Sequence, residues 1–282
     1  MALEERVISH EGGRLRYLIG GSGPAILLCH GFIGSAENFD GWLPALLPRR
    51  TVIAPDLPGF GSSTPLRGRH SAAALARAAV AAAAHAGAAR YDVAGLCLGS
   101  SVAMAVQRQR HDAVQRVILH TPLLNPGLVR RHFHVQVGFM TAPVVWPAIV
   151  WLGHQRIVSD TYKRFIVEGS VVDPRAAQVN FENQVRADPR AAREWLRDGL
   201  RCDEIDLVRT DERRTLILMA REDRVIDVPR IVRTLGREPH IELAVVDDGG
   251  HAWTESMRMS QRADIAAFLD DQPLRSAATA AA

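Results

Sequence analysis

The 282-residue sequence is poor in lysine, and it has no long run of residues of one charge. Lys163 is the single lysine, and the 34 basic and 31 acidic residues are scattered along the chain without a run of five or six of one sign. A nucleic-acid-binding protein usually gathers its basic residues into a patch or a tail. We therefore expect no nucleic-acid partner.

Cysteine is also scarce. Cys29, Cys97 and Cys202 are an odd number of widely separated thiols without a C-x-x-C pair, so neither a disulfide framework nor a zinc site is expected. We expect no cofactor and no metal. The first residues include Glu4 and Glu5, where a secretory signal would carry basic residues, so the sequence predicts a cytoplasmic protein. The oligomeric state stays open.

A long apolar run occurs once, over residues 135–153, which contain no charged residue. Pro143 and Pro147 interrupt this run, and no second run could satisfy the backbone groups that proline frees inside a bilayer. We therefore expect a pocket lining here and no membrane span.

Short apolar runs alternate with helical patterns over most of the chain, and 47% of the residues are hydrophobic. This alternation predicts a doubly wound, largely parallel sheet of about eight strands. Two N-terminal segments, Val7–His10 and Leu15–Ile19, predict an antiparallel hairpin. The other predicted strands are Ala25–Cys29, Thr51–Ala54, Tyr91–Ala94, Val117–His120, Thr215–Met219 and Ile241–Val246, and the predicted helices are Ala36–Leu47, Ser71–Ala88, Leu98–Arg110, Val228–Leu235 and Glu255–Leu269.

The alternation stops between residues 122 and 212, where helical periodicity continues but no strand-like run appears. This stretch holds eight of the sixteen aromatic residues, more than its share of the chain. We expect a helical cap at 122–212 inserted after strand 6, a core made of 1–121 and 213–275, and a disordered tail at 276–282.

The segment Gly95–Gly99 has cysteine at its centre, follows a predicted strand and opens a predicted helix. Glycine two residues before and two after Cys97 lets strand and helix approach closely, and the turn presents the central side chain at the edge of the sheet. The adjacent helix N-terminus favours a thiolate. The motif predicts a nucleophile at Cys97; the alternative is a small buried residue in a glycine-rich turn.

Four further motifs follow in order. His30–Phe32 lies after the third predicted strand and Asp56–Ser63 after the fourth; Arg221–Pro229 and Gly249–His251 follow the last two. With the Gly95–Gly99 turn, they make the chain resemble the α/β-hydrolase superfamily over nearly its whole length. The resemblance implies an α/β-hydrolase fold with a helical cap.

The resemblance also assigns roles. It implies a triad of Cys97, His251 and Asp223, with Asp227 as the competing acid, and an oxyanion hole made by the backbone N–H groups of Phe32 and Leu98. Most relatives carry serine at the turn. Cysteine there is similar to dienelactone hydrolases, polyhydroxyalkanoate synthases and some thioesterase-like domains, none of which fits the whole chain. The residues expected to bind substrate are His120, Phe139, Trp146, Trp151 and Trp253.

Three functions remain open. The first is an acyl-handling enzyme that forms a covalent acyl-thioenzyme on an apolar ester, thioester or lactone, and that hydrolyses, transfers or cyclises the acyl group, as in secondary metabolism. The second is a lyase in which His251 and Asp223 act as a base and a carboxylate such as acetate leaves an acylated intermediate. The third is a non-catalytic binder of small molecules.

Overall fold

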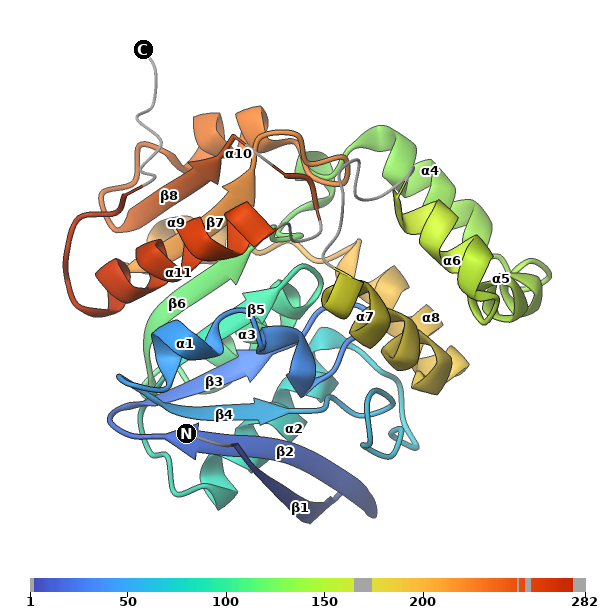
Figure 1. Cartoon of the computed structure of the whole chain (residues 1–282), viewed down its shortest axis with the longest axis horizontal. Helices are drawn as coiled ribbons and strands as arrows, with labels where there is room; N and C mark the ends of the chain where they lie inside the picture. Colours follow the sequence, from blue (N-terminus) through green and yellow to red (C-terminus); the bar gives the residue numbers. More distant parts are fainter. Residues whose placement is uncertain (1–2, 165–173, 248, 252–254, 276–282) are drawn as a thin grey trace.

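The computed structural model describes residues 3–164, 174–247, 249–251 and 255–275, and they form the expected eight-stranded sheet (Figure 1). The strand order is β1-β2-β4-β3-β5-β6-β7-β8. β1 and β2 pair antiparallel to each other, and β2 pairs antiparallel to β4, while all later pairs are parallel. The strands are β1 (Glu4–His10), β2 (Gly13–Gly21), β3 (Ala25–Cys29), β4 (Thr51–Pro55), β5 (Tyr91–Leu96), β6 (Val114–His120), β7 (Thr215–Ala220) and β8 (Ile241–Val246).

Helices cover both faces of this sheet. α1 and α11 lie on one face and α2, α3 and α10 on the other (Figure 1). Alternate residues of a strand therefore enter different cores: Leu27 packs with the α2–α3 side and Ile26 with the α1–α11 side. These helices are α1 (Leu43–Leu46), α2 (Ala72–His85), α3 (Gly99–Gln109), α10 (Val228–Leu235) and α11 (Glu255–Leu269).

One predicted helix is wrong in its extent. Residues 36–47 form a short 3-10 helix, η1 (Ala36–Phe39), and then the four-residue α1, instead of one continuous helix. Pro44 has no N–H to donate to the preceding turn, so it fits the first turn of α1 but would break a helix running through it.

Between β6 and β7 the described residues are helical, and we call residues 122–212 the helical segment. It contains η2 (Pro126–Leu128), α4 (Arg131–Met140), α5 (Trp146–Gly153), α6 (Arg156–Tyr162), α7 (Pro174–Arg186), α8 (Pro189–Gly199) and α9 (Ile205–Thr210). Figure 1 shows α4, α5 and α6 projecting away from the sheet, with α7 and α8 nearer to it. The expected tail at 276–282 lies outside the described residues.

α8 is docked tightly onto the sheet. Its Trp195 is fully buried against His30 and Phe60, with ring centroids 6.1 and 5.1 Å away. The turn after β4 makes room for the helix at Gly59, which has a φ of +89° and where a Cβ would lie 2.4 Å from the Cβ of Ala191. The Asp56–Ser63 motif is therefore the part of the chain against which α8 packs.

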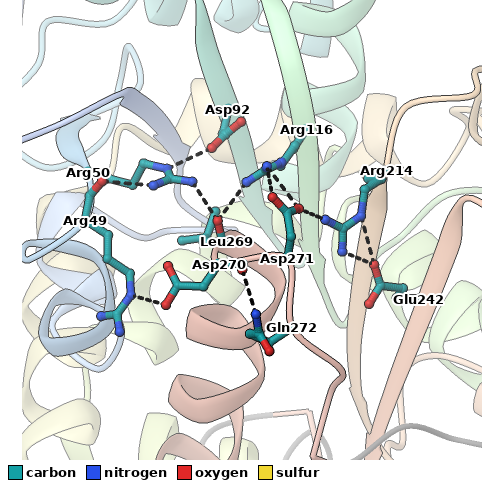
Figure 2. A network of polar contacts seen from close by, with 10 residues as sticks. All are labelled: Arg49, Arg50, Asp92, Arg116, Arg214, Glu242, Leu269, Asp270, Asp271 and Gln272. Carbon is teal, nitrogen blue, oxygen red and sulfur yellow. Dashed lines mark hydrogen bonds and ion pairs between the residues drawn. The ribbon is translucent and has the colours of Figure 1, made fainter.

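The opposite edge of the sheet is held by a network of arginines and acids around the end of α11 (Figure 2). Arg50 pairs with the buried Asp92 at 3.0 Å and also donates to the carbonyl of Leu269 at 3.2 Å. Arg116 donates to the same carbonyl at 2.9 Å. The network thus anchors the far end of α11, the helix that begins at Glu255.

Candidate active site

The turn between β5 and α3 holds Cys97 in a strained conformation. Its φ is +51°, in the left-handed region that residues with a Cβ rarely adopt. Its N–H donates to the carbonyl of His120 on the neighbouring strand at 2.8 Å, which ties the turn to the edge of the sheet. The strain and this bond together fix where the thiol lies.

The two glycines of the motif are required by close backbone approach. A Cβ on Gly95 would lie 2.5 Å from the carbonyl oxygen of Gly99, and a Cβ on Gly99 would lie 2.3 Å from the carbonyl oxygens of Cys29 and His30. No side chain fits into such gaps without moving backbone. The glycines therefore let β3, β5 and α3 pack closely around the thiol.

Three side chains from three separate loops meet at the carboxyl edge of the sheet. His251 Nε2 lies 3.1 Å from Cys97 Sγ, and His251 Nδ1 lies 2.9 Å from Asp223 Oδ2. The other oxygen of Asp223 accepts the backbone N–H groups of Val225 and Ile226 at 2.7 and 2.9 Å. Because Asp223 can only accept when ionised, it orients the ring so that Nδ1 donates to it and Nε2 faces the sulfur.

The protonation of His251 follows from its neighbours. Burial alone would lower its pKa, but the negative charges of Asp223 and Cys97 and the hydrogen bonds to them outweigh burial and raise the pKa well above its ordinary value of 6.5. The site therefore favours the protonated, cationic form of the histidine. A cation 3.1 Å from sulfur stabilises negative charge there.

Asp227, the competing acid, has a different role in the structure. Its carboxylate caps α10 by accepting the N–H of Arg230 at 3.1 Å. Asp223 is the aspartate that contacts His251.

Arg130, at the start of α4, contacts the loop that carries Asp223. Its Nε donates to the carbonyls of Asp223 at 3.0 Å and Ile226 at 3.2 Å, and its N–H donates to the carbonyl of Val225 at 2.8 Å. This role of Arg130 could not be predicted from the sequence, because no local pattern indicates a contact between residues 93 positions apart. Arg130 thus couples the helical segment to the site.

Two residues that line the same cavity as the thiol are Phe32, after β3, and Leu98, next to Cys97. Within the described part of the chain, neither backbone N–H donates to another group. Buried N–H groups that keep no partner are rare, and such a pair suits an oxygen that carries negative charge.

The cavity has a volume of about 690 Å³ and lies between the sheet edge and the helical segment. Cys97 and His251 line it, together with apolar side chains such as Phe133, Val137 and Trp146. Its lining also includes polar side chains, among them Asn38, Asp40 and Arg175. A cavity of this size with a mostly apolar lining suits a small molecule with an apolar part.

Of the five residues expected to bind substrate, His120 and Trp146 line the cavity. His120 is buried at the end of β6, and burial together with the charge of His251 lowers its pKa to about 3. It is a neutral neighbour of the site at physiological pH. Its Nδ1 lies 3.1 Å from the hydroxyl of Thr121.

Phe139 and Trp151, which were also expected to bind substrate, lie away from the cavity. Both side chains are about two-thirds exposed, and neither lines the cavity. The sequence shows that this stretch is apolar, but not which face of each short helix turns inward. In the structure Val137 of α4 and Trp146 of α5 face the cavity. Trp253 lies outside the described residues.

The described residues contain no cluster of three or more His, Cys, Asp or Glu side chains that could hold a metal ion. Among them, no helix is long and apolar enough to span a bilayer, and the uncharged run at 135–153 is divided between α4 and α5.

Comparison with known proteins gives a consistent family. A family model described as the alpha/beta hydrolase fold matches residues 24–253. A pimeloyl-[acyl-carrier protein] methyl ester esterase of Xanthomonas campestris is 29% identical over 252 residues, covering 82% of this chain and 89% of that protein. An uncharacterised protein of Mycobacterium tuberculosis is 40% identical over 108 residues, but this match spans 38% of the chain and only about a third (32%) of that protein.

The fold is also found among solved structures. The esterase RhEst1 of Rhodococcus sp. ECU1013 superposes with a TM-score of 0.74 and 19% identity, over 97% of this chain and 100% of that one. At this level of identity the likeness concerns the fold alone.

Proposed function

Because the chain belongs to the α/β-hydrolase family, we propose that it is a cofactor-independent acyl-handling enzyme in which Cys97 is the nucleophile. The substrate is an ester, thioester or lactone with an apolar acyl part. The single observation that carries this proposal is the 3.1 Å contact between His251 Nε2 and a sulfur held at a φ of +51° on the strand-to-helix turn.

In the first half-reaction the Cys97 thiolate attacks the carbonyl carbon, and the electron pair of the C=O bond moves to oxygen. The N–H groups of Phe32 and Leu98 bind that oxyanion. When the tetrahedral intermediate collapses, the bond to the leaving group breaks, and His251 gives its Nε2 proton to that group. The product is a thioester between the acyl group and Cys97.

In the second half-reaction an acceptor with an O–H, N–H or S–H bond loses its proton to His251 as it attacks the thioester. Collapse of the second intermediate releases the thiolate and restores the cationic histidine. Water gives hydrolysis, and a second substrate or an internal hydroxyl gives transfer or cyclisation. Throughout, Asp223 holds the ring orientation and stabilises its positive charge.

In this proposal the helical segment is a cap over the site. Its side chains that line the cavity, among them Phe133 and Trp146, would hold the apolar acyl part against the thiol, and the polar lining residues would face the leaving group. Holding the reacting atoms together in a cavity that excludes water favours attack at the carbonyl.

The test is the turnover of short-chain and medium-chain p-nitrophenyl esters by matched cysteine variants. Cys97→Ala should lose about 10⁶-fold in kcat, as removal of a triad nucleophile does. Cys202→Ala is the control: burial and the neighbouring acids raise the pKa of this thiol to about 12, and it donates to the Gly199 carbonyl at 2.8 Å. It should turn over like wild type.

Turnover by folded Cys97→Ala within tenfold of wild type would overturn the covalent mechanism. Loss of a proton from the substrate by that variant would then point to a lyase based on His251 and Asp223. Ligand-induced stabilisation without any product, in wild type as well, would point to a binding protein.

A further inference from the structure

Exposed apolar side chains gather on the outer helices α4–α6. Among the described residues nine large hydrophobic side chains are exposed, and six of them fall between positions 135 and 158. Val144 is 89% exposed, and Phe139 and Trp151 are about two-thirds exposed. Single exposed hydrophobic residues are normal on a protein surface, but six within 24 positions mark a surface that binds something.

One of these helices, α5, is apolar on two sides. In α5 no side chain is polar: Trp146, Ile149 and Val150 line the cavity, while Trp151 faces outward. A helix that is apolar all round is normally buried all round. In this structure the inner side has the cavity, and the outer side has no cover among the described residues.

The same stretch is cationic. Residues 122–164 contain five basic residues and one acid, Asp160. Arg130 contacts the Asp223 loop, Arg156 pairs with Asp160 and Lys163 lines the cavity, so the exposed basic side chain on α4 is Arg131. On α4, Arg131, Val135 and Phe139 follow one another at intervals of four, so a basic side chain heads the exposed apolar face. His132 next to Arg131 is exposed as well.

We propose that α4, α5 and α6 form a docking surface for an anionic lipid bilayer, with the exposed apolar side chains entering the interface and the basic ones at the level of the headgroups. Helices that lie in a bilayer interface combine Trp, Phe and aliphatic side chains with Arg or Lys in this way. Figure 1 shows these helices projecting from the body of the molecule, so they can reach a bilayer before the rest of the chain does.

The charge argues for lipid and against a second copy of the chain. Two copies that paired through this surface would each bring Arg131 to the shared interface, and α4 carries no acid to compensate it. Anionic headgroups have the opposite charge and attract each nearby arginine. The inner faces of the same helices line the cavity, so an apolar molecule taken from the bilayer would be close to Cys97.

Flotation with vesicles of stated composition tests this surface, with the full-length protein and no substrate. Wild type should float with phosphatidylcholine vesicles that contain about 30% phosphatidylglycerol, and should float much less with phosphatidylcholine alone. Phe139→Ser combined with Trp151→Ser should reduce binding by at least about tenfold. Arg131→Ser should reduce it by about fivefold at low salt, and less at high salt.

Matched controls separate this surface from general stickiness. Val7→Ser on β1 and Met259→Ser on α11 remove exposed apolar side chains far from α4–α6 in the chain, and both should bind like wild type. Thermal melting checks that each variant is folded. Cys97→Ala should bind vesicles like wild type, because binding does not need the thiol. Failure of the catalytic proposal would therefore not affect the proposal for this surface.

Three outcomes would overturn the proposal. The first is the absence of wild-type binding to anionic vesicles. The second is binding that the Phe139 and Trp151 double variant retains in full. The third is a dimer in sedimentation equilibrium that Trp151→Ser dissociates, because a second copy would then occupy the surface.

Discussion

The carboxyl edge of the sheet and the outer helices α4–α6 differ in how firmly their side chains are held. At the sheet edge His251 lies within hydrogen-bonding distance of both Cys97 and Asp223. Close glycine packing fixes the Cys97 turn, and two backbone N–H groups hold the carboxylate of Asp223. The outer helices meet the rest of the molecule through apolar side chains such as Val137 and through polar contacts such as Trp146 Nε1 to the Pro189 carbonyl at 3.0 Å and Arg193 Nε to the Thr141 carbonyl at 2.8 Å.

The difference teaches where position matters. Chemistry at a thiol needs its partners within a few tenths of an ångström, so that edge is built from strained and tightly packed backbone. A wall that only receives an apolar group can be made of helices with interchangeable hydrophobic side chains. Changes at the edge should therefore abolish turnover, and changes in the outer helices should alter binding.

The largest expected contrast is between Asp223→Asn and Trp146→Ala. Asp223→Asn would leave His251 without its charged partner and allow the wrong tautomer, so kcat should fall by about 10⁴-fold. Trp146→Ala removes part of the apolar wall and should mainly raise KM, by roughly tenfold. Steady-state kinetics on a p-nitrophenyl ester measures both. A kcat for Asp223→Asn close to that of wild type would remove the distinction between edge and wall.

Two tryptophans of the helical segment sharpen the comparison in terms of stability. Trp195 on α8 is fully buried between His30 and Phe60, so Trp195→Ala should lower the free energy of unfolding by about 3–5 kcal/mol. Trp151 on α5 is 63% exposed, so Trp151→Ala should change it by less than about 0.5 kcal/mol. Urea denaturation gives both values. Equal losses would mean that α5 is packed as firmly as α8.

A smaller effect concerns pH. The pKa of His251 is raised in the folded protein above its ordinary value of 6.5, so the folded state holds this proton more tightly than the unfolded state does. The stabilisation is fully present below pH 6.5 and is lost as the pH rises through the raised pKa. The free energy of unfolding of His251→Gln should therefore fall less than that of wild type over this range. Parallel pH profiles of the two proteins would contradict the raised pKa.

Cys97→Ser gives a direct reading of the same charge balance. Part of the rise in the pKa of His251 comes from the sulfur, and a serine hydroxyl is neutral in this pH range. The imidazole of Cys97→Ser should therefore titrate at lower pH than that of wild type in NMR spectra of the ring protons. An unchanged titration would mean that Asp223 alone sets the protonation of His251.

Much of the sheet could be predicted from the sequence because each buried strand is a short apolar run between turn residues. Tyr91–Ala94 and Ile241–Val246, for example, correspond to β5 and β8 within a few residues. The glycines at positions 95 and 99 could also be interpreted, since their spacing has a steric reason that holds in any strand-turn-helix context.

Features that depend on distant parts of the chain could not be predicted in this way. The apolar pattern predicts one continuous helix where Pro44 divides it in two. Which face of α5 turns inward depends on how it packs against α7 and α8. Arg130 contacts the Asp223 loop through two carbonyls, a contact that leaves no local pattern. These are tertiary choices, and the composition of each segment permits more than one of them.

Intact-protein mass spectrometry after rapid acid quench tests the central claim most directly. Wild type is mixed with p-nitrophenyl butyrate at neutral pH, and the adduct is located by peptide mapping, with Cys97→Ala as the control. The account predicts one butyryl group per chain, attached to Cys97 as a thioester, and none on Cys29, whose pKa burial raises to about 12. Continued turnover by wild type with no acyl adduct at any time after mixing, or an adduct elsewhere on the chain, would contradict it.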